Sequence, residues 1–267
     1  MPTDFPQLSL ELAALCRRTA QFIREEARTF DRTKVEHKGV HDLVSYVDQE
    51  TERRLVTGLR QLLPEAGFIT EEGTAGPDTH LEEFTWIIDP LDGTTNFVHG
   101  LPIYSISVAL LHRKELMVGV VHEANRDESF RAVRGGGAFC NDRPIHVSDV
   151  PKLNNALVAT GFPYTNFVQL PNYLQVLGTF MTRTHGLRRL GSAAVDLAYV
   201  AAGRFEGYFE FNLNSYDVAA GLLLVREAGG RTTQFLEEGD PLFGREVVAS
   251  NGLVHAEMQT IIGEFWT

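Results

Sequence analysis

Two strand-like segments in the middle of the chain narrow the choice of folds more than any other part of the sequence. Residues 103–112 and 116–123 are rich in β-branched and other apolar residues, and the polar run His-Arg-Lys-Glu joins them. A short polar turn between two such segments is typical of an antiparallel β-hairpin. We therefore expect a sheet with antiparallel strands, which argues against a simple doubly wound parallel fold.

Helix-like and strand-like segments alternate on both sides of this hairpin. Apolar residues recur every three or four positions over residues 8–30, which predicts an amphipathic helix, and a second helix is expected over residues 48–63. The other predicted elements are strands over 68–71, 85–89, 129–133, 157–160, 206–210, 230–234 and 247–250 and helices over 171–181, 193–202, 216–227 and the last residues. This order predicts layered α/β packing. A soft boundary near residues 150–155 separates an amino-terminal half, 1–150, from a carboxy-terminal half, 151–267, and we expect one compact unit.

The charge balance bears on possible partners. The 24 basic and 35 acidic residues give a formal net charge of −11, which disfavours direct binding to nucleic acid. An acidic protein can still take a phosphorylated substrate if divalent metal ions supply positive charge. The sequence shows no signal-peptide pattern and no apolar run of roughly 20 residues, so we expect a cytoplasmic protein without a membrane partner.

An acidic run, Asp-Pro-Leu-Asp-Gly-Thr at residues 89–94, follows the apolar residues 86–88. Pro90 disfavours helix at Asp89, and Gly93 permits a tight turn, so two carboxylates are expected close together at the end of a buried strand. Like charges so placed destabilise the fold unless a cation lies between them, and hard oxygen ligands favour Mg²⁺ or Mn²⁺. Taken alone, such a run is more often an ordinary turn.

Two further acidic positions could complete a metal site. Glu71 belongs to the pair Glu71-Glu72 at the end of a predicted strand, where a solvated charged loop is the ordinary interpretation. Asp217 lies where the helix over residues 216–227 is expected to begin, and there the ordinary interpretation is an N-terminal helix cap.

Taken together, these segments resemble the inositol monophosphatase family. Its members carry an acidic pair after a strand, then a D-P-x-D-G-T turn, and later a W-D-x-A-A-G helix start; all three occur here in this order, and Thr95-Asn96-Phe97 continues the turn as in the family. The third motif departs at Tyr216, where the family usually has Trp, and this change could shift substrate preference. The resemblance implies a layered α-β-α-β-α sandwich with mixed, largely antiparallel sheets.

The resemblance also implies which residues hold metal and activate water. Two or three Mg²⁺ ions, or Mn²⁺, are expected per site. Thr94 matches the threonine that orients the attacking water together with Glu71, and Asp92 counts with them as catalytic. Lys38 and Asp48 fall in the region where the family has a mobile loop that contributes to a further, weaker metal position. The residues that match metal ligands are Glu71, Asp89, the backbone carbonyl of Leu91, Asp92 and Asp217.

On the substrate side, Gly191-Ser192-Ala193 looks like the family's segment that touches the sugar or cyclitol. Glu210, seven residues before Asp217, matches the acidic residue that accepts a hydrogen bond from a substrate hydroxyl, although a solvent-facing strand end is the alternative interpretation. The implied substrate-binding residues are Asp92, Gly93, Thr94, Gly191, Ser192, Ala193, Glu210 and Asp217.

The implied activity is magnesium-dependent hydrolysis of inositol monophosphate, or a similar small polyol phosphate, by metal-activated water. The resemblance also implies that lithium inhibits the enzyme and that the chain forms a homodimer. Relatives that act on histidinol phosphate, fructose bisphosphate or a 3′-phosphorylated nucleotide are the alternatives, and Thr95-Asn96-Phe97 argues against the nucleotide enzymes. A different class of function is binding to the transcription machinery, as bacterial members of the family can do. The complete set of acidic ligands favours an active enzyme.

Overall fold

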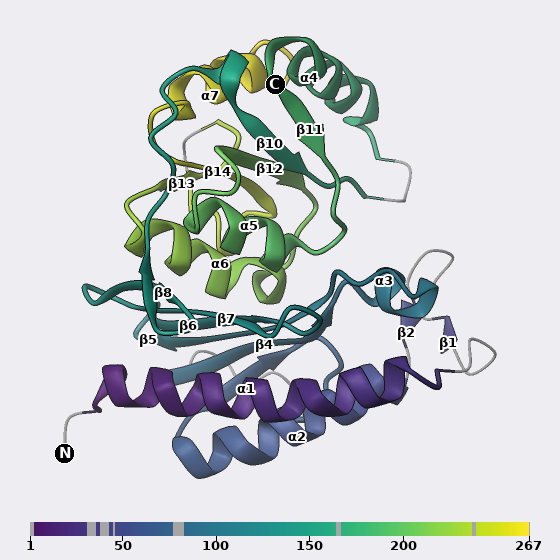
Figure 1. Ribbon diagram of the computed structural model, residues 1–267, viewed down its shortest axis with the longest axis vertical. Coiled ribbons are helices and arrows are strands. Elements are labelled where there is room, and N and C mark those ends of the chain that lie inside the picture. Colours follow the sequence, from purple (N-terminus) through teal and green to yellow (C-terminus); the bar gives the residue numbers. More distant parts are fainter. Residues whose placement is uncertain are drawn as a thin grey trace.

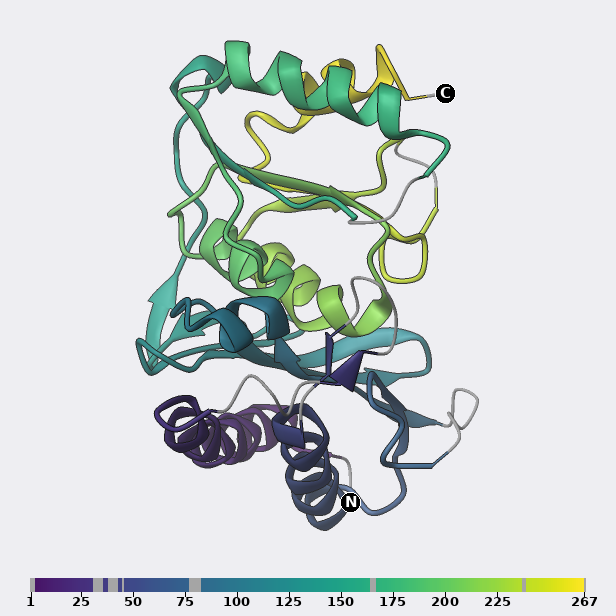
Figure 2. The same ribbon diagram turned by 90° about the vertical axis from the view of Figure 1, so that its right-hand side faces the viewer.

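The computed structural model describes residues 3–30, 46–76, 83–163, 167–236 and 239–266, and the backbone alone at 36–37 and 43–44. Five layers stack in the order α-β-α-β-α, with a sheet between each pair of helical layers (Figure 1, and after a quarter turn Figure 2). This arrangement confirms the predicted sandwich. The helical layers are α1 (Phe5–Ala27) with α2 (Tyr46–Leu62), α5 (Ala193–Ala201) with α6 (Ser215–Glu227), and α4 (Leu170–Arg183) with α7 (His255–Gly263).

Helix α1 forms where the apolar stripe predicted it, although it begins earlier. Asp4 Oδ1 accepts a hydrogen bond from Gln7 N at 3.1 Å, and Pro6 lies in the first turn, so the start of the helix is well defined. Its apolar face is buried against α2 and the sheet, with Leu12 and Ile23 fully buried. None of the described helices is long and apolar enough to span a membrane.

The seven-stranded sheet has the order β3-β4-β5-β6-β7-β8-β9, and only the β3–β4 pair is parallel. The predicted hairpin is confirmed as β5 and β6, and its turn residues Arg113 and Lys114 both have positive φ, 51° and 72°, as a primed turn needs. The strands are β3 (Gly67–Thr70), β4 (Phe84–Asp92), β5 (Ser105–His112), β6 (Glu115–Glu123), β7 (Glu128–Val133), β8 (Gly137–Cys140) and β9 (Arg143–Ile145); β1 (Glu36–His37) and β2 (Leu43–Val44) pair separately.

The five-stranded sheet has the order β11-β10-β12-β14-β13. Strand β10 is parallel to both of its neighbours, whereas β14 is antiparallel to β12 and β13. Both sheets are therefore mixed. The strands are β10 (Leu157–Thr160), β11 (Gly186–Arg188), β12 (Gly207–Phe211), β13 (Arg231–Thr233) and β14 (Glu246–Ser250), and the short 3₁₀ helix η2 (Leu153–Asn155) precedes β10.

Helices α5 and α6 lie between the sheets, so they are buried on nearly every side. Every residue of α5 is buried, and in α6 burial extends from Val218 to Val225. The backbones approach closely at Gly119 of β6, where a Cβ would lie 3.0 Å from the Ala220 carbonyl oxygen. Because α6 packs on β5 and β6, we propose that the halves 1–150 and 151–267 fold as one unit.

The acidic run differs from the expected turn. Strand β4 continues through Pro90 and Leu91 to Asp92, with an irregularity in its pairing to β5 between Asp89 and Asp92, and the chain turns only at Gly93, where φ is 100°. A bulge of this kind re-aims side chains at the end of a strand. The short helix α3 (Thr94–His99) and strands β8, β9 and β11 were not predicted, because three to six residues show too little periodicity.

Candidate active site

The sheet topology brings the acidic residues of three segments together. Strands β3 and β4 are parallel, with Thr70 opposite Ile88, so the residues that follow them come out at the same edge. Glu71 N donates to the Ile88 carbonyl at 3.3 Å, which places this glutamate beside Asp89. Asp217 arrives from the first turn of α6. Asp89 is 2% exposed, while Glu71, Asp92 and Asp217 are half-buried.

Burial raises the pKa of all four carboxyl groups, and for Glu71, Asp89 and Asp217 neighbouring negative charges raise it further. For Glu71 and Asp89 the pKa lies well above its usual range, first because of burial and next because of Asp217 and Glu71 respectively. Burial, followed by the charge of Asp92, raises the pKa of Asp217 to about 8. The side-chain contact between Glu71 and Asp89 lowers the pKa of Glu71 and raises the pKa of Asp89.

The donor set suits a hard divalent cation. It consists of carboxylate oxygens, and a cation among them would relieve the repulsion that raises their pKa values. Within the described part of the chain, no three Asp, Glu, His or Cys side chains already have the arrangement of a preformed metal centre. Asp89, Asp92 and Asp217 each use one oxygen to accept a backbone N–H. The carboxylates are thus held near one another, and binding a cation would require them to turn toward it.

Thr94 connects the acidic cluster to helix α2. Its hydroxyl lies 2.9 Å from Asp48 Oδ1 and 3.0 Å from the Leu91 carbonyl oxygen. Asp48 is fully buried, and its charge is one of those that raise the pKa of Glu71. The structure therefore brings Asp48 and the Leu91 carbonyl to the same side of the cluster as Thr94. Lys38 lies outside the described residues.

Asp92 joins the acidic cluster to the predicted substrate segment. Its Oδ2 accepts hydrogen bonds from Ser192 Oγ and Ala194 N, each at 2.7 Å, at the start of α5. Burial raises the pKa of Asp92 to about 6, while these hydrogen bonds act in the opposite direction. Gly93 and Gly191 permit the close approach, since a Cβ on Gly93 would lie 3.2 Å from the Gly191 carbonyl oxygen. Ser192 and Ala193 begin α5 and so lie directly beside Asp92.

Glu210 lies near Asp92 at the end of β12. Tyr208 donates its hydroxyl to Glu210 Oε2 at 2.6 Å, and a Cβ on Gly161 would overlap the Glu210 carboxylate. Burial raises the pKa of Glu210 to about 7, while Tyr208 and the positive charge of Arg189 act against it. The Glu210 side chain is half-buried, so it is not the solvent-facing strand end of the alternative interpretation.

Asp217 also has a structural contact, although it is not the helix cap itself. The cap of α6 is Asn214, whose backbone N–H donates to Asp217 Oδ2 at 2.6 Å. Asp217 is the third residue of the helix, the position of the acidic partner in a capping box. The interpretation of Asp217 as the N-terminal cap was therefore wrong, because the cap lies three residues earlier. The contact with the Asn214 N–H orients the Asp217 carboxylate. Tyr216, in the usual place of Trp, is half-buried, and its carbonyl lies 3.4 Å from Ser107 Oγ.

Three residues near the cluster were given no role in the site by the sequence analysis. Asn96 donates from Nδ2 to the carbonyls of Ile103 and Leu190, each at 2.8 Å, and so ties α3 to the segment before Ser192. Arg189 lowers the pKa of Asp92, Glu210 and Asp196. Asp196 is 1% exposed, and its Oδ1 has no hydrogen-bond partner among the described residues. A lone Asp in the apolar sequence of α5 was the available signal.

Known proteins match the chain over most of its length. The pattern of the inositol monophosphatase family covers residues 7–267. A putative Nus factor SuhB from Neisseria meningitidis serogroup B is 44% identical over 92% of this chain and 94% of the relative. An inositol-1-monophosphatase from Rhizobium meliloti is 43% identical over 86% of each chain.

The fold comparison agrees with the sequence comparison. An IMPase from Thermotoga maritima superposes with a TM-score of 0.85 at 35% identity, covering 95% of both chains. The chain therefore belongs to the inositol monophosphatase family and is a metal-dependent phosphoric monoester hydrolase.

Proposed function

We propose that the chain hydrolyses inositol monophosphate, or a similar small polyol phosphate, to the alcohol and inorganic phosphate. The observation that carries this proposal is the Asp92 carboxylate, which belongs to the acidic cluster and also contacts Ser192 and Ala194. A phosphate bound through metal at the cluster would have its alcohol portion beside Ser192 and Glu210. Carboxylates and hydroxyls at that place recognise substrate hydroxyl groups.

Glu71, Asp89, Asp92, Asp217 and the Leu91 carbonyl are the residues proposed to hold the metal ions. When bound, Mg²⁺ lowers the pKa of a coordinated water and neutralises charge on the phosphoryl group. Thr94 and Glu71 are proposed to orient the attacking water, with Asp48 fixing the Thr94 hydroxyl through the 2.9 Å contact. Asp92 positions the start of α5, and Glu210 accepts a hydrogen bond from a substrate hydroxyl.

Several finer features belong to the same proposal. We expect two or three Mg²⁺ ions per site, with Mn²⁺ as a substitute, and inhibition by lithium. Asp48 and Lys38 are proposed to support the weaker metal position. A cytoplasmic homodimer is the expected state, and the net charge of −11 supports the expectation that the chain does not bind nucleic acid directly.

The substrate is tested by assaying the purified protein with Mg²⁺ against inositol 1-phosphate, histidinol phosphate, fructose 1,6-bisphosphate and a 3′-phosphorylated nucleotide. We expect the highest kcat/KM for inositol 1-phosphate, and no activity after metal is removed. A higher kcat/KM for histidinol phosphate would replace the proposed substrate by that alternative. Activity that persists without metal would overturn the proposed chemistry.

A second candidate function is a contact with the transcription machinery. It is favoured by the 44% identity to a protein named as a putative Nus factor. Retention of the chain on immobilised RNA polymerase with its elongation factors would support this role, and passage through the column without delay would contradict it. Asp92→Asn serves as a control, because a binding role should survive loss of catalysis.

A further inference from the structure

A pocket of about 350 Å³ lies where the end of α1 meets α3 and the residues that flank β5 and β6, and its walls include Arg24, Arg28, Phe97, Pro102, Tyr104 and Asn125. This size is within the range of small-molecule sites, roughly 300–1,000 Å³. Tyr104 packs in the core formed with α1 and α2, whereas the next residue, Ser105, faces Ser192 on the other side. The residue before β5 therefore lines the pocket, whereas the first residue of β5 faces the start of α5.

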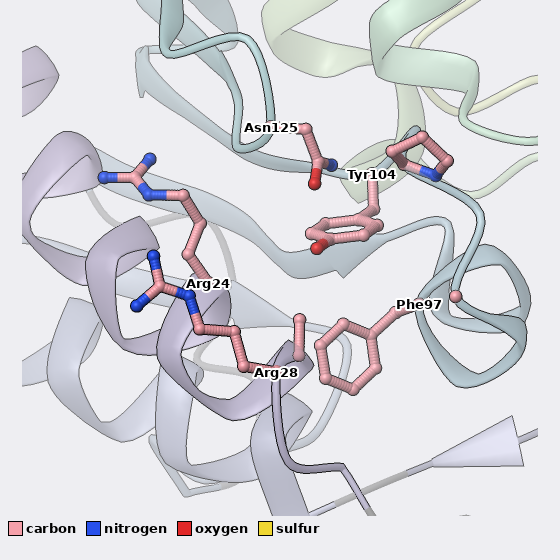
Figure 3. Close-up of a pocket in the computed structure, with 8 residues that line it drawn as sticks. Arg24, Arg28, Phe97, Tyr104 and Asn125 are labelled. Carbon is pink, nitrogen blue, oxygen red and sulfur yellow. The ribbon is translucent and has the colours of Figure 1, made fainter.

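Two arginines four residues apart give one wall its charge: Arg24 lies in the last turn of α1, and Arg28 is the C-cap residue that follows the helix. In Figure 3 the side chains of Arg24 and Arg28 run alongside each other, across the pocket from Phe97, Tyr104 and Asn125. Arg24 Nη1 donates to the Ala124 carbonyl at 2.9 Å and lies 3.6 Å from Asp127 Oδ1. Among the described residues, no hydrogen-bond or ion-pair partner faces the Arg28 side chain. Like charges four residues apart on a helix repel, so an anion between them would stabilise both.

The opposite wall combines polar and apolar groups. Tyr104 and Asn125 share a side-chain hydrogen bond. Glu123 is a buried acid that accepts hydrogen bonds from Asn125 N at 3.1 Å, Asn125 Nδ2 at 3.3 Å and Arg126 N at 2.6 Å. Its charge is thus already compensated within its own turn, while Phe97 and Pro102 supply apolar surface. Two cations beside an aromatic ring and a proline suit an organic anion.

We propose that this pocket binds a small organic anion, in which a phosphate, phosphonate or carboxylate group is attached to an aromatic or short apolar body. Arg28 and Arg24 would bind the anionic group by charge-assisted hydrogen bonds. Phe97 and Pro102 would contact the apolar body. The site is separate from the proposed phosphatase chemistry, since none of its walls is formed by the acidic cluster.

The test is calorimetric titration of phenylphosphonate into metal-free protein from which the chelator has been removed. Without metal the acidic cluster repels anions, so binding there does not mask the pocket. We expect one saturable site per chain and a Kd at least ~10-fold higher in Arg28→Gln, as for loss of one charge-assisted hydrogen bond. Arg18→Gln removes the same charge from an exposed position of the same helix and is the matched control.

Benzoate and benzyl alcohol complete the design. Benzoate tests whether a carboxylate replaces the phosphonate, and a saturable site for either anion that weakens in Arg28→Gln but not in Arg18→Gln supports the proposal. Three results would overturn it: no saturable binding of either anion, equal affinity in Arg28→Gln and the parent protein, or equal weakening by both substitutions. Benzyl alcohol that binds as tightly as the anions would also overturn it, because it carries no charge.

Discussion

Replacing Asp92 by Asn separates the chemical role of this carboxylate from its structural role. Asp92 Oδ2 accepts hydrogen bonds from Ser192 Oγ and Ala194 N, and an amide oxygen of the same shape can accept them too. The variant should keep α5 joined to β4 while one negative charge leaves the cluster. We expect turnover with Mg²⁺ to fall at least ~100-fold, since metal-assisted charge stabilisation is worth several kcal/mol and each ~1.4 kcal/mol is tenfold.

The same variant should be more stable than the parent protein when no metal is bound. Burial raises the pKa of Asp92 from 3.8 to about 6, so the ionised carboxylate costs about 3 kcal/mol of folding free energy above pH 6. This destabilisation is absent below pH 3.8, grows as the pH rises to 6 and is constant above. Weaker hydrogen bonds to a neutral amide offset part of the gain, which leaves ~1–2 kcal/mol at pH 7.5.

Urea denaturation of metal-free protein measures the free energy of unfolding, and a phosphate-release assay measures turnover. Asp142→Asn is the control, because the Asp142 side chain is 74% exposed and lies outside the cluster. At pH 4.5 the stability difference should nearly vanish, and added Mg²⁺ should stabilise the parent protein more than Asp92→Asn. Near-normal turnover, or a variant less stable than the parent at pH 7.5 without metal, would refute the reasoning.

Three further outcomes follow from the same contacts. Glu210→Gln should raise KM for polyol phosphates and have little effect on KM for phenyl phosphate. Gly161→Ala should give the same result, because its Cβ would displace the Glu210 carboxylate. An equal rise in KM for both substrates would contradict the assigned contact. His122 is fully buried with its pKa lowered to about 4, so about 3 kcal/mol of stability should be lost as the pH falls from 6.5 to 4. Urea titrations of His122→Asn should lack that part of the pH dependence. Gly93→Ala should lower the free energy of unfolding by about 1–3 kcal/mol. Gly93 has φ 100°, and the added Cβ would lie 3.0 Å from the Ile103 carbonyl oxygen. An unchanged free energy of unfolding would show that the turn can relax.

Local patterns in the sequence were sufficient for most of the elements. Neighbouring residues alone produce the apolar stripe of α1, the polar turn between β5 and β6, and the break in the pattern before β10. Each of these elements appears within a few residues of its predicted bounds. The extension of β4 through Pro90 could not be predicted in this way. It depends on pairing of Asp92 with Ser105, a residue of another strand.

The sequence alone determined which acidic residues were candidates for a site, because the runs around Glu71, Asp89 and Asp217 are visible as motifs. Only the tertiary structure decided what surrounds them. Asp48 meets Thr94, and Ser192 meets Asp92, through contacts that span 46 and 100 positions of the chain. Spacing along a chain carries no information about such distances, since they are set by how β3 pairs with β4 and how α5 packs between the sheets.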